Sequence, residues 1–469
     1  MRDVFIIGVD TIKFGKYLDK SIKDLACQTV TGCLKDANIT KKEIQSIWFS
    51  NSNWCNMSGQ TGIRGQVALR PMGIDVIPMT NVENACAGAS TALHHAWLEV
   101  ASGEYDMTMA LGVEKLYDSN SSAVFAGFLG YIDIENCVKI AGSMPNFGLS
   151  EDDLKQLDEF KKKYQCNGNG SSSKRKKKKT IKSRIKDLKD SIVTGINLGE
   201  KIGYKTVYKL LAISSGDHSP FMDIYSFAAR QHMKKYGSTI EQLATIASKN
   251  HFNSSLNPNA QYQFLVPVDK VLSDRIISFP LTRSMCAPIG DGAASALVCS
   301  EKKVKELGLM NQAVKIKASI LGSGSKRPFE SDEPEIGQRL AKKAYERAGV
   351  SPEDIGLAEV HDATAYGEIC QVENLGFCPK GEGGILAEKG ATQLDGSIPI
   401  NTSGGLISRG HPIGASGLAQ IHELVTQLRG HAGKRQVKNP RLAMGENGGG
   451  ALGAEEAAMC IHILEAPCV

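Results

Sequence analysis

Residues 401–430 read NTSGGLISRGHPIGASGLAQIHELVTQLRG, a loop of small residues that runs into an amphipathic helix. Residues 81–104 read NVENACAGASTALHHAWLEVASGE and follow the same plan of an Asn, a small-residue loop and a helix. An apolar stretch follows each copy, MTMALGVEKL at 107–116 and RLAMGENGGG at 441–450, and each stretch predicts a strand. The chain therefore carries an internal repeat of one α/β unit.

A second repeat lies at residues 36–51 (DANITKKEIQSIWFSN) and 341–362 (AKKAYERAGVSPEDIGLAEVHD). Each copy has an amphipathic helix, a break, a Thr or Ser N-cap, a short acidic helix start and an apolar strand. A further strand is expected at residues 4–9. Two βαβ-rich halves predict two similar α/β layers that pack as a pseudo-dimer.

The basic residues of the chain are concentrated in one tract. The 469 residues carry a formal charge of +5, but residues 161–189 hold 13 Lys or Arg and one acidic residue, Asp187, a local charge of +12. The remainder of the chain therefore carries −7. A nucleic-acid-binding protein would spread its basic residues over a patterned face, so we expect no nucleic-acid partner.

The tract belongs to a low-complexity segment between the two halves. Residues 165–190 read QCNGNGSSSKRKKKKTIKSRIKDLKD and cannot bury enough apolar surface to order themselves. We expect a flexible, solvated insertion at about 155–195. The alternative is a tract that contacts the phosphates of a bound nucleotide cofactor or an anionic partner.

Cysteine usage and hydropathy indicate the compartment. The 12 cysteines have irregular spacings, with no CxxC pair and no Cys/His set at zinc spacing, which predicts reduced thiols and no metal site. No apolar run reaches the roughly 20 residues of a membrane span. The start, MRDVFIIGVD, is typical of a strand rather than a signal peptide. We expect a soluble cytoplasmic protein, or one of an organelle matrix in a eukaryote.

Cys86 is the first candidate for chemistry. It lies in NACAGAS (84–90), at a predicted strand-to-helix junction. Backbone N–H groups at a helix N-terminus stabilise a thiolate, and small neighbours let a substrate approach closely. Taken alone, the residue fits a buried structural cysteine better than a nucleophile. The motifs in the rest of the chain favour a nucleophilic role for Cys86.

His411 lies at the repeat-equivalent place in the second half, in RGHPIG (409–414). Pseudo-symmetry would make the two helix N-termini face one cleft, so that His411 reaches Cys86 and acts as its base. His361 and Asp362 end an apolar strand at 356–360, a common place for active-site residues. The run GENGGG (445–450) would expose backbone N–H groups that can stabilise an oxyanion.

Together these residues resemble the thiolase superfamily, and the resemblance covers nearly the whole chain outside the insertion. GHPIGASG after NTSGGL is a highly specific motif for that family. The sterol carrier protein 2 type of thiolase is the most similar, and HDAT (361–364) resembles a bacterial branch that includes the thiolase subunit of benzoylsuccinyl-CoA thiolase. Other matching stretches are AARQHMKKYG (228–237), KNHFNSSLNPNAQYQ (249–263), PIGDGAASALV (288–298), VHDATAYGEI (360–369), GEICQVENLGFCPKGEGG (367–384) and QLRGHAGKRQV (427–437).

The resemblance implies a thiolase fold, with two pseudo-symmetric βαβαβαββ halves in five layers (α-β-α-β-α) and a loop domain. Residues 1–115 and 256–305 would form the N-terminal half, and residues 116–255 the loop domain. Residues 306–469 would form the C-terminal half. A homodimer is expected on the same ground.

The resemblance also implies roles at the matching positions. Cys86 would carry the acyl group, and His411 would activate the thiol and help bind the thioester oxygen. His361 would complete that first oxyanion hole. The backbone N–H groups of Cys86 and Gly449 would form a second hole, for the acyl-enzyme carbonyl.

The chain departs from the family in its acid/base residue. Most thiolases use a second cysteine, but Ala363 and Asn447 occupy the two positions where it would lie. Neither residue can shuttle a proton. Glu446, His361 or a bound water would then supply the acid/base work. On the strand predicted at 441–450, Glu446 and Asn447 are the candidate positions. We assign no such role to Cys370 or Cys378.

We therefore predict an acyl-CoA C-acyltransferase that cleaves a β-keto acyl-CoA with coenzyme A as co-substrate and no bound cofactor. The substrate would be benzoylsuccinyl-CoA-like, in lipid or aromatic catabolism. One alternative is a Claisen-condensing or retro-aldol CoA-ester enzyme. Another is a CoA-ester-binding subunit that is active only with a small zinc-containing OB-fold partner. A Rossmann dehydrogenase is excluded because Gly8-Val9-Asp10-Thr11 replaces the required glycine fingerprint.

Overall fold

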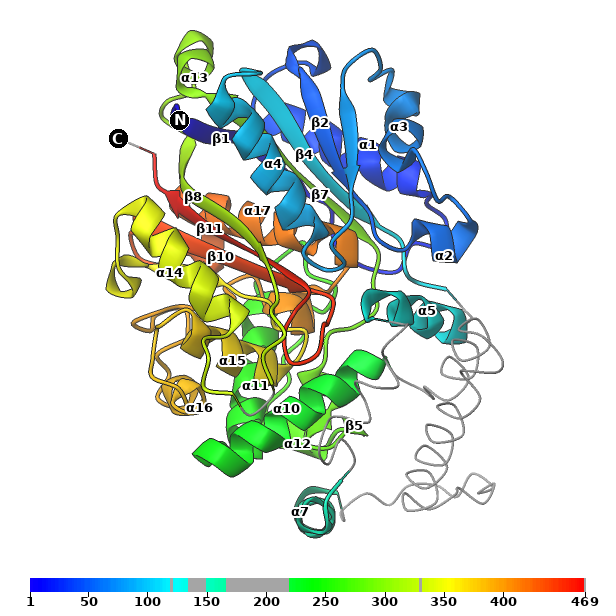
Figure 1. The fold of residues 1–469 in the computed structure, drawn as a ribbon, viewed down its shortest axis with the longest axis vertical. Helices are drawn as coiled ribbons and strands as arrows, with labels where there is room; N and C mark the ends of the chain where they lie inside the picture. The colour runs from blue at the N-terminus through cyan, green and yellow to red at the C-terminus, as the bar shows by residue number, and fades with distance from the viewer. Residues whose placement is uncertain (119–120, 134–148, 166–218, 329–330, 468–469) are drawn as a thin grey trace.

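The repeated segments fold into two matching α/β halves in the computed structural model, which describes residues 1–118, 121–133, 149–165, 219–328 and 331–467 (Figure 1). The first half has the predicted βαβαβαββ order. Its elements are β1 (Val4–Thr11), α1 (Ile22–Asp36), β2 (Ser46–Ser50), α3 (Arg64–Leu69), β3 (Met79–Val82), α4 (Gly88–Ser102), β4 (Met107–Glu114) and, after a long excursion, β7 (Gly292–Ser300).

The second half repeats this order, except that its third strand is shortened to a single bridge. Where a third strand would lie, Ile400 forms only an isolated bridge with Ala358. Pro399 cannot donate to a ladder, and Asn401 turns the chain with a φ of 55°. The elements are β8 (Val314–Ser323), α14 (Ile336–Ala348), β9 (Leu357–Glu359), α15 (Ala365–Asn374), α16 (Gly383–Glu388), α17 (Ser416–Leu428), β10 (Leu442–Gly449) and β11 (Ala458–Glu465).

The strands of the two halves are joined edge to edge. The order is β3-β2-β4-β7-β1-β8-β11-β10-β9, and the halves meet where β1 pairs with β8 at Phe5 and Ile6. The two predicted β layers are therefore joined at one edge, through the short β1–β8 pairing, into one hydrogen-bonded order of nine strands. β2, β3 and β4 pair in parallel, so their carboxyl ends lie together beside the N-terminus of α4.

Helices α4 and α17 form the layer between the two halves. Their apolar side chains, Leu93 and Val100 on α4 and Leu418 and Val425 on α17, share one buried cluster with residues of both halves. A second cluster joins α1 to the outer face of the first half, and a third joins α14 and α15 to the second. This arrangement confirms the predicted α-β-α-β-α layering.

The helices α4 and α17 approach closely at their N-termini because of one glycine. A Cβ on Gly417 would lie 2.2 Å from Oγ of Ser90 and 2.5 Å from Oδ1 of Asn447. Both distances are too short for any side chain. Gly417 therefore lets the two helix N-termini, one from each half, meet at one place.

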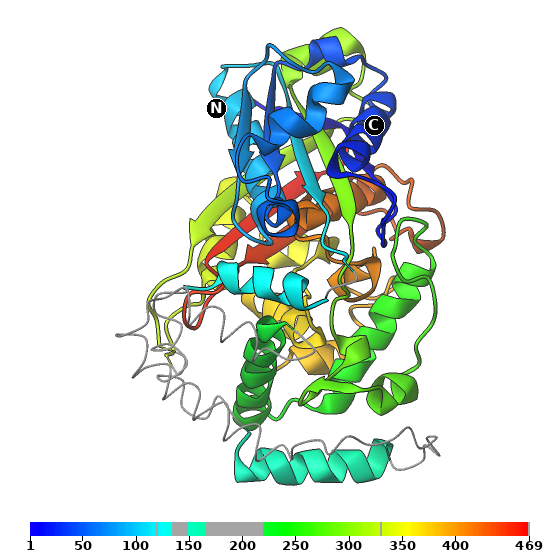
Figure 2. The same ribbon diagram turned by 90° about the vertical axis from the view of Figure 1, so that its right-hand side faces the viewer.

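The excursion between β4 and β7 begins beside the first half, where α5 (Ser121–Phe128) packs near the short helix at Trp54–Ser58. It then supplies a separate group of helices at the end of the molecule away from the first half (Figures 1 and 2). Helix α11 and its neighbours bury Leu243, Ile246 and Val271 in a cluster of their own. The elements are α5 (Ser121–Phe128), α7 (Glu151–Tyr164), α10 (Pro220–Tyr236), α11 (Ile240–Ser255), α12 (Val268–Ser273), β5 (Ile276–Ser278) and β6 (Leu281–Thr282).

The predicted flexible insertion at about 155–195 begins inside α7. Ser150 forms a capping box with Asp153, and Leu157 and Phe160 are buried against the α11 cluster. Residues 155–164 are therefore an ordered helix. The remainder of the insertion, from residue 166, lies outside the described residues. The domain boundaries derived from the sequence stay a prediction.

Short helices connect the larger elements, and none of the described helices is long and apolar enough to cross a membrane. All nine cysteines in the described segments are free thiols. The short elements are α2 (Trp54–Ser58), α13 (Glu301–Leu307), a π-helical turn at Gly405–Arg409 and 3₁₀ turns at Lys41–Glu43, Arg70–Met72, Leu129–Tyr131, Arg283–Met285, Pro352–Asp354, Ile413–Ala415 and Gly433–Arg435.

Candidate active site

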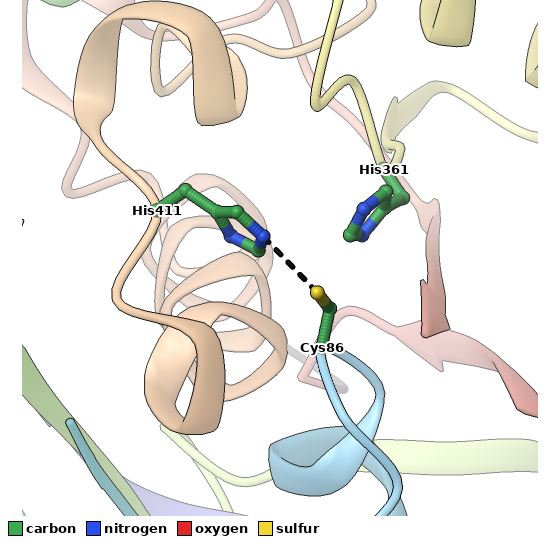
Figure 3. Close-up of side chains that lie close together, drawn as sticks. All are labelled: Cys86, His361 and His411. Carbon is green, nitrogen blue, oxygen red and sulfur yellow. Dashed lines mark hydrogen bonds between the residues drawn. The ribbon is translucent and has the colours of Figure 1, made fainter. Parts of the chain in front are cut away.

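Cys86 lies two residues before α4, on a turn forced by its neighbour. Ala85 has a φ of 48°, which is rare for a residue with a Cβ. The turn is held by Oγ of Ser52, which donates to the carbonyl oxygen of Ala85 at 3.1 Å. The Cys86 side chain is half-buried and points toward the second half of the chain (Figure 3).

His411 comes from that second half and reaches the thiol. Its Nε2 lies 3.3 Å from Sγ of Cys86 (Figure 3), and its Nδ1 lies 2.7 Å from Oγ of Ser416. The Ser416 hydroxyl donates its proton to the carbonyl oxygen of Pro412 at 2.9 Å, so it accepts from Nδ1–H. Nε2 is then unprotonated and faces the thiol as a base.

His361 lies on the other side of Cys86 and is held by two consecutive residues of β10. Its ring is 5.2 Å from the ring of His411, nearly perpendicular to it. Nδ1 of His361 lies 3.0 Å from Nδ2 of Asn447, and the His361 backbone N–H donates to Oε2 of Glu446 at 2.8 Å. Both the ring and the main chain of His361 are therefore fixed.

The end of β10 packs directly against the Cys86 turn. A Cβ on Gly449 would lie 2.4 Å from the backbone nitrogen of Ala87 and 2.8 Å from that of Cys86. The N–H groups that lower the pKa of the Cys86 thiol by hydrogen bonding are those of Cys86 itself and Gly450. The amide that faces the sulfur thus belongs to the residue after Gly449. The oxyanion role of Gly449 stays a prediction.

Burial favours a neutral resting pair. It raises the pKa of Cys86 to about 12, with the charges of Glu83 and Glu114 adding to the shift. Burial also lowers the pKa of His411 well below its usual value, and the nearby charges of His361 and Arg409 lower it further. The resting site therefore holds a thiol and a neutral imidazole, and the proton can move to His411 as a substrate is attacked.

Glu114 ties the two halves together beneath this pair. Its Oε2 accepts from the backbone N–H of Ser52 and of Gly414, each at 3.0 Å, and its Oε1 accepts from Asn53 N–H at 3.1 Å. Gly414 lies three residues after His411. One buried carboxylate therefore fixes the His411 loop against the loop that supports Cys86.

An apolar cluster surrounds the sulfur. Leu116, Val124 and Ile413 are buried in it, and Phe128 and Tyr131 pack against it together with Cys86. Oη of Tyr131 is buried and has no hydrogen-bond partner in the parts of the chain that the structure describes. Such a wall suits an acyl group that is mainly apolar and carries one polar atom.

Two carboxyl groups lie near the end of β10. Glu446 is fully buried, and burial raises its pKa to about 8. Glu456, in the β10–β11 loop, is half-buried, and its Oε1 accepts from Nε2 of Gln371 at 3.1 Å. Burial raises the pKa of Glu456 to about 7. The phenol of Tyr225 lies within electrostatic reach of Glu456, Glu446 and Cys86.

The donor atoms of Cys86, His361 and His411 all lie within 4.8 Å of one another, a spacing that could hold a metal ion. Three protein ligands are the usual number for a catalytic zinc. However, Asn447 Nδ2 donates to Nδ1 of His361, which leaves the ring proton on Nε2. A protonated nitrogen cannot coordinate a metal, so the set is better suited to hydrogen bonding.

The structure brings together Cys86, His361, His411, Glu446, Asn447 and Gly449. Other residues singled out in the sequence lie apart from the thiol. Asp362 is buried and accepts from Leu406 N–H and from Nδ2 of Asn250, so its contacts tie this segment to the π-helical turn and to α11. The Cys370 thiol contacts Glu335 and Asn374. Sequence reasoning missed Ser416, Glu114, Glu456 and Tyr225, and it singled out Gly449 rather than Gly450 within GENGGG. Ser416 carried a signal because it belongs to the GHPIGAS run.

Comparison with known proteins agrees with this geometry. Two family models match the chain, the thiolase N-terminal domain over residues 4–129 and the thiolase C-terminal domain-like family over residues 335–464. The acetyl-CoA acetyltransferase of Methanothermobacter thermautotrophicus is 32% identical over 97% of this chain and 98% of its own length. Rabbit (Oryctolagus cuniculus) sterol carrier protein 2 is 31% identical over 95% of this chain and 69% of its own.

Other similarities reach specialised proteins. The benzoylsuccinyl-CoA thiolase subunit BbsB of Thauera aromatica is 29% identical over 96% of this chain and 95% of its own. A solved structure of an Ltp2–ChsH2(DUF35) aldolase covers 100% of this chain and 98% of its own, with a TM-score of 0.69 and 19% identity. A thiolase fold is thereby established. The chain belongs to the thiolase family and is an acyltransferase of the thiolase type.

Proposed function

We propose that the chain cleaves a β-keto acyl-CoA by thiolysis through an acyl group carried on Cys86. The observation that carries this proposal is the 3.3 Å contact between Sγ of Cys86 and Nε2 of His411, with Ser416 holding His411 in the base tautomer. A nucleophile, its base and an orienting group in hydrogen-bond reach form the usual arrangement for covalent catalysis. The two halves of the chain supply one partner each.

In the first half-reaction, the Cys86 proton passes to Nε2 of His411 while the sulfur attacks the β-keto carbon. The C2–C3 bond then breaks, and its electron pair stays on C2 as the enolate of the departing acyl-CoA. That enolate takes up a proton, and the shortened acyl group remains on Cys86 as a thioester. A buried neutral pair suits this order, because charge forms only when substrate is present.

In the second half-reaction, the thiol of coenzyme A loses its proton to a base and attacks the Cys86 thioester. The Cys86 sulfur leaves and regains its proton, and a new acyl-CoA is released. The N–H groups of Cys86 and of the Gly449–Gly450 turn, which lie beside the sulfur, would receive the acyl oxygen. Coenzyme A is thus a co-substrate and not a resident cofactor. The solved human mitochondrial 3-ketoacyl-CoA thiolase in complex with CoA, with a TM-score of 0.60 and 15% identity, supports this assignment.

The proton for C2 needs a carrier in place of the missing second cysteine. Oε2 of Glu446 is occupied by the backbone N–H of His361, and the residue is fully buried. Glu456 is half-buried, and the one oxygen engaged by a side chain is Oε1, which binds Gln371. We therefore place the acid/base role on Glu456 in preference to Glu446.

The substrate class is proposed as an acyl-CoA with an apolar, aromatic-sized acyl group, as in benzoylsuccinyl-CoA. The apolar cluster around Cys86 and the buried phenol of Tyr131 support it. The name of the Thauera relative points the same way. Lipid or aromatic catabolism would be the setting, and the cytoplasm the compartment.

The second candidate is retro-aldol or Claisen chemistry on a CoA ester. It is favoured by Ala363 and Asn447 at the positions of the second cysteine, and by the similarity to a solved aldolase. That aldolase is named together with a DUF35 component, and the Thauera relative is called a subunit. We therefore propose a small zinc-containing OB-fold partner, as well as homodimerisation.

Mass spectrometry of the intact protein tests the main proposal. Incubation with candidate β-keto acyl-CoAs, with and without the partner, should add the mass of one acyl group at Cys86. The Cys86→Ala variant should stay unmodified. A wild-type protein that never gains this mass under any of these conditions would refute the acyl-enzyme, and product analysis separates thiolysis from retro-aldol cleavage.

A further inference from the structure

Asn447 contacts the His361 ring through its side-chain amide, and the orientation of that amide sets the tautomer of the ring. Nδ2 of Asn447 lies 3.0 Å from Nδ1 of His361, and the two residues are 1% and 3% exposed. An amide nitrogen donates and does not accept. In this orientation of the amide, Nδ1 is the unprotonated ring nitrogen.

The proton of the neutral ring then lies on Nε2. Burial lowers the pKa of His361 to about 4, so the ring is neutral at physiological pH. With Nδ1 occupied by Asn447, Nε2–H is the polar group of His361 left to face a substrate. His411 cannot supply this donor in the resting state, because its Nε2 is the base for Cys86.

We infer that Asn447 is a positioning residue that fixes the tautomer of His361, so that Nε2–H donates to the substrate carbonyl oxygen. This inference rests on the proposed acyl transfer at Cys86. It gives Asn447 a part different from acid/base catalysis. Its neighbour Glu446 holds the backbone of the same histidine, so two adjacent residues of β10 fix both ends of His361.

The Asn447→Asp variant tests the inference, because it keeps the size of the side chain and replaces its donor by an acceptor. The carboxylate of this variant would hold the proton on Nδ1 of His361, and Nε2 would then repel the substrate oxygen. We expect the rate of Cys86 acylation at pH 8 to fall about 100-fold, the usual cost of losing one oxyanion donor. KM should change much less than kcat.

The pH profile distinguishes this role from loss of structure. Cys86, His411 and the backbone-bound Glu446 are the titratable groups beside His361. A new carboxylate raises the pKa of His361, and the imidazolium carries N–H on both nitrogens. The activity of Asn447→Asp relative to wild type should therefore increase as the pH falls. Parallel profiles for the two proteins would overturn the inference.

A second measurement reads the tautomer directly in the wild-type protein. In wild-type protein labelled with ¹⁵N-histidine, the His361 signals, assigned with His361→Gln among the 10 histidines, should show a pyridine-like Nδ1 and a protonated Nε2. A protonated Nδ1 would refute the inference whatever the kinetics show. If wild-type Cys86 is never acylated while Nδ1 is pyridine-like, the proposed function fails and the tautomer assignment stands.

Discussion

Ser416 accepts a hydrogen bond from Nδ1 of His411 at 2.7 Å, on the side of the ring away from Cys86. This hydrogen bond keeps the ring proton on Nδ1, so that Nε2 is free to accept the proton of Cys86. We therefore expect Ser416→Ala to slow Cys86 acylation by about 10–100-fold, a part of the 10²–10⁴-fold that a general base supplies. Ser416→Thr keeps the hydroxyl and should stay within a few-fold of wild type. Stopped-flow acylation measures both variants, and equal rates for Ser416→Ala and wild type would exclude the tautomer role.

The neutral Cys86–His411 pair predicts a particular pH dependence of alkylation. Because burial raises the pKa of Cys86 to about 12, the thiolate fraction grows tenfold per pH unit across the neutral and alkaline range. The iodoacetamide rate at Cys86 should therefore keep rising up to pH 9 and beyond. A preformed thiolate–imidazolium pair would instead give a plateau below pH 8, and such a plateau would contradict the neutral pair.

Gly417 should be intolerant of any side chain. A methyl group there would collide with Ser90 and Asn447, so we expect Gly417→Ala to lower the free energy of unfolding by about 1–3 kcal/mol. Gly62 is the matched control, since a Cβ there would meet nothing within 4 Å. Urea denaturation of both variants gives the comparison. Equal midpoints would mean that the helix N-termini can move apart at no cost.

Exchange of the C2 protons identifies the proton carrier. Incubated in D₂O with a saturated acyl-CoA, the wild type should exchange deuterium into C2. Glu456→Gln should exchange at least about 100-fold more slowly, as expected for loss of a general acid/base. Glu446→Gln is the control because Glu446 is fully buried and its Oε2 binds the His361 backbone N–H. Loss of exchange in Glu446→Gln, with Glu456→Gln unaffected, would reassign the role.

Much of the fold was accessible from the sequence because it is repeated. Apolar runs such as 107–116 predict strands, and the two small-residue loops predict two equivalent helix N-termini. The Cys86–His411 contact followed from that equivalence, since symmetry-related ends must share one cleft. The reduced third strand of the second half could not be predicted from that equivalence. Its cause is local, because it lies in Pro399 and in the turn at Asn401.

The supporting residues of the site depend on distances that no pattern encodes. Glu114 is linked to Gly414, 300 residues away, by a single hydrogen bond, and nothing beside it in the sequence marks that partner. Asn447 reads as a departure from the family, and its contact with His361 emerges only when β9 and β10 pair. The amide that faces the Cys86 sulfur belongs to Gly450 and not to Gly449, and which of the two it is depends on where β10 ends.

Because Cys86 lies at the shared interface of the two halves, its reactivity reports on their assembly. In a chain whose halves have not yet docked, this cysteine would have the pKa of an ordinary thiol, roughly 8.5, and would react rapidly with alkylating agents. In the assembled chain Cys86 packs with Leu116, Val124 and Ile413, the last from the second half, and burial raises its pKa to about 12. Pulsed alkylation during refolding would thus record the moment at which the second half arrives, because the protection of one sulfur depends on a loop more than 300 residues away.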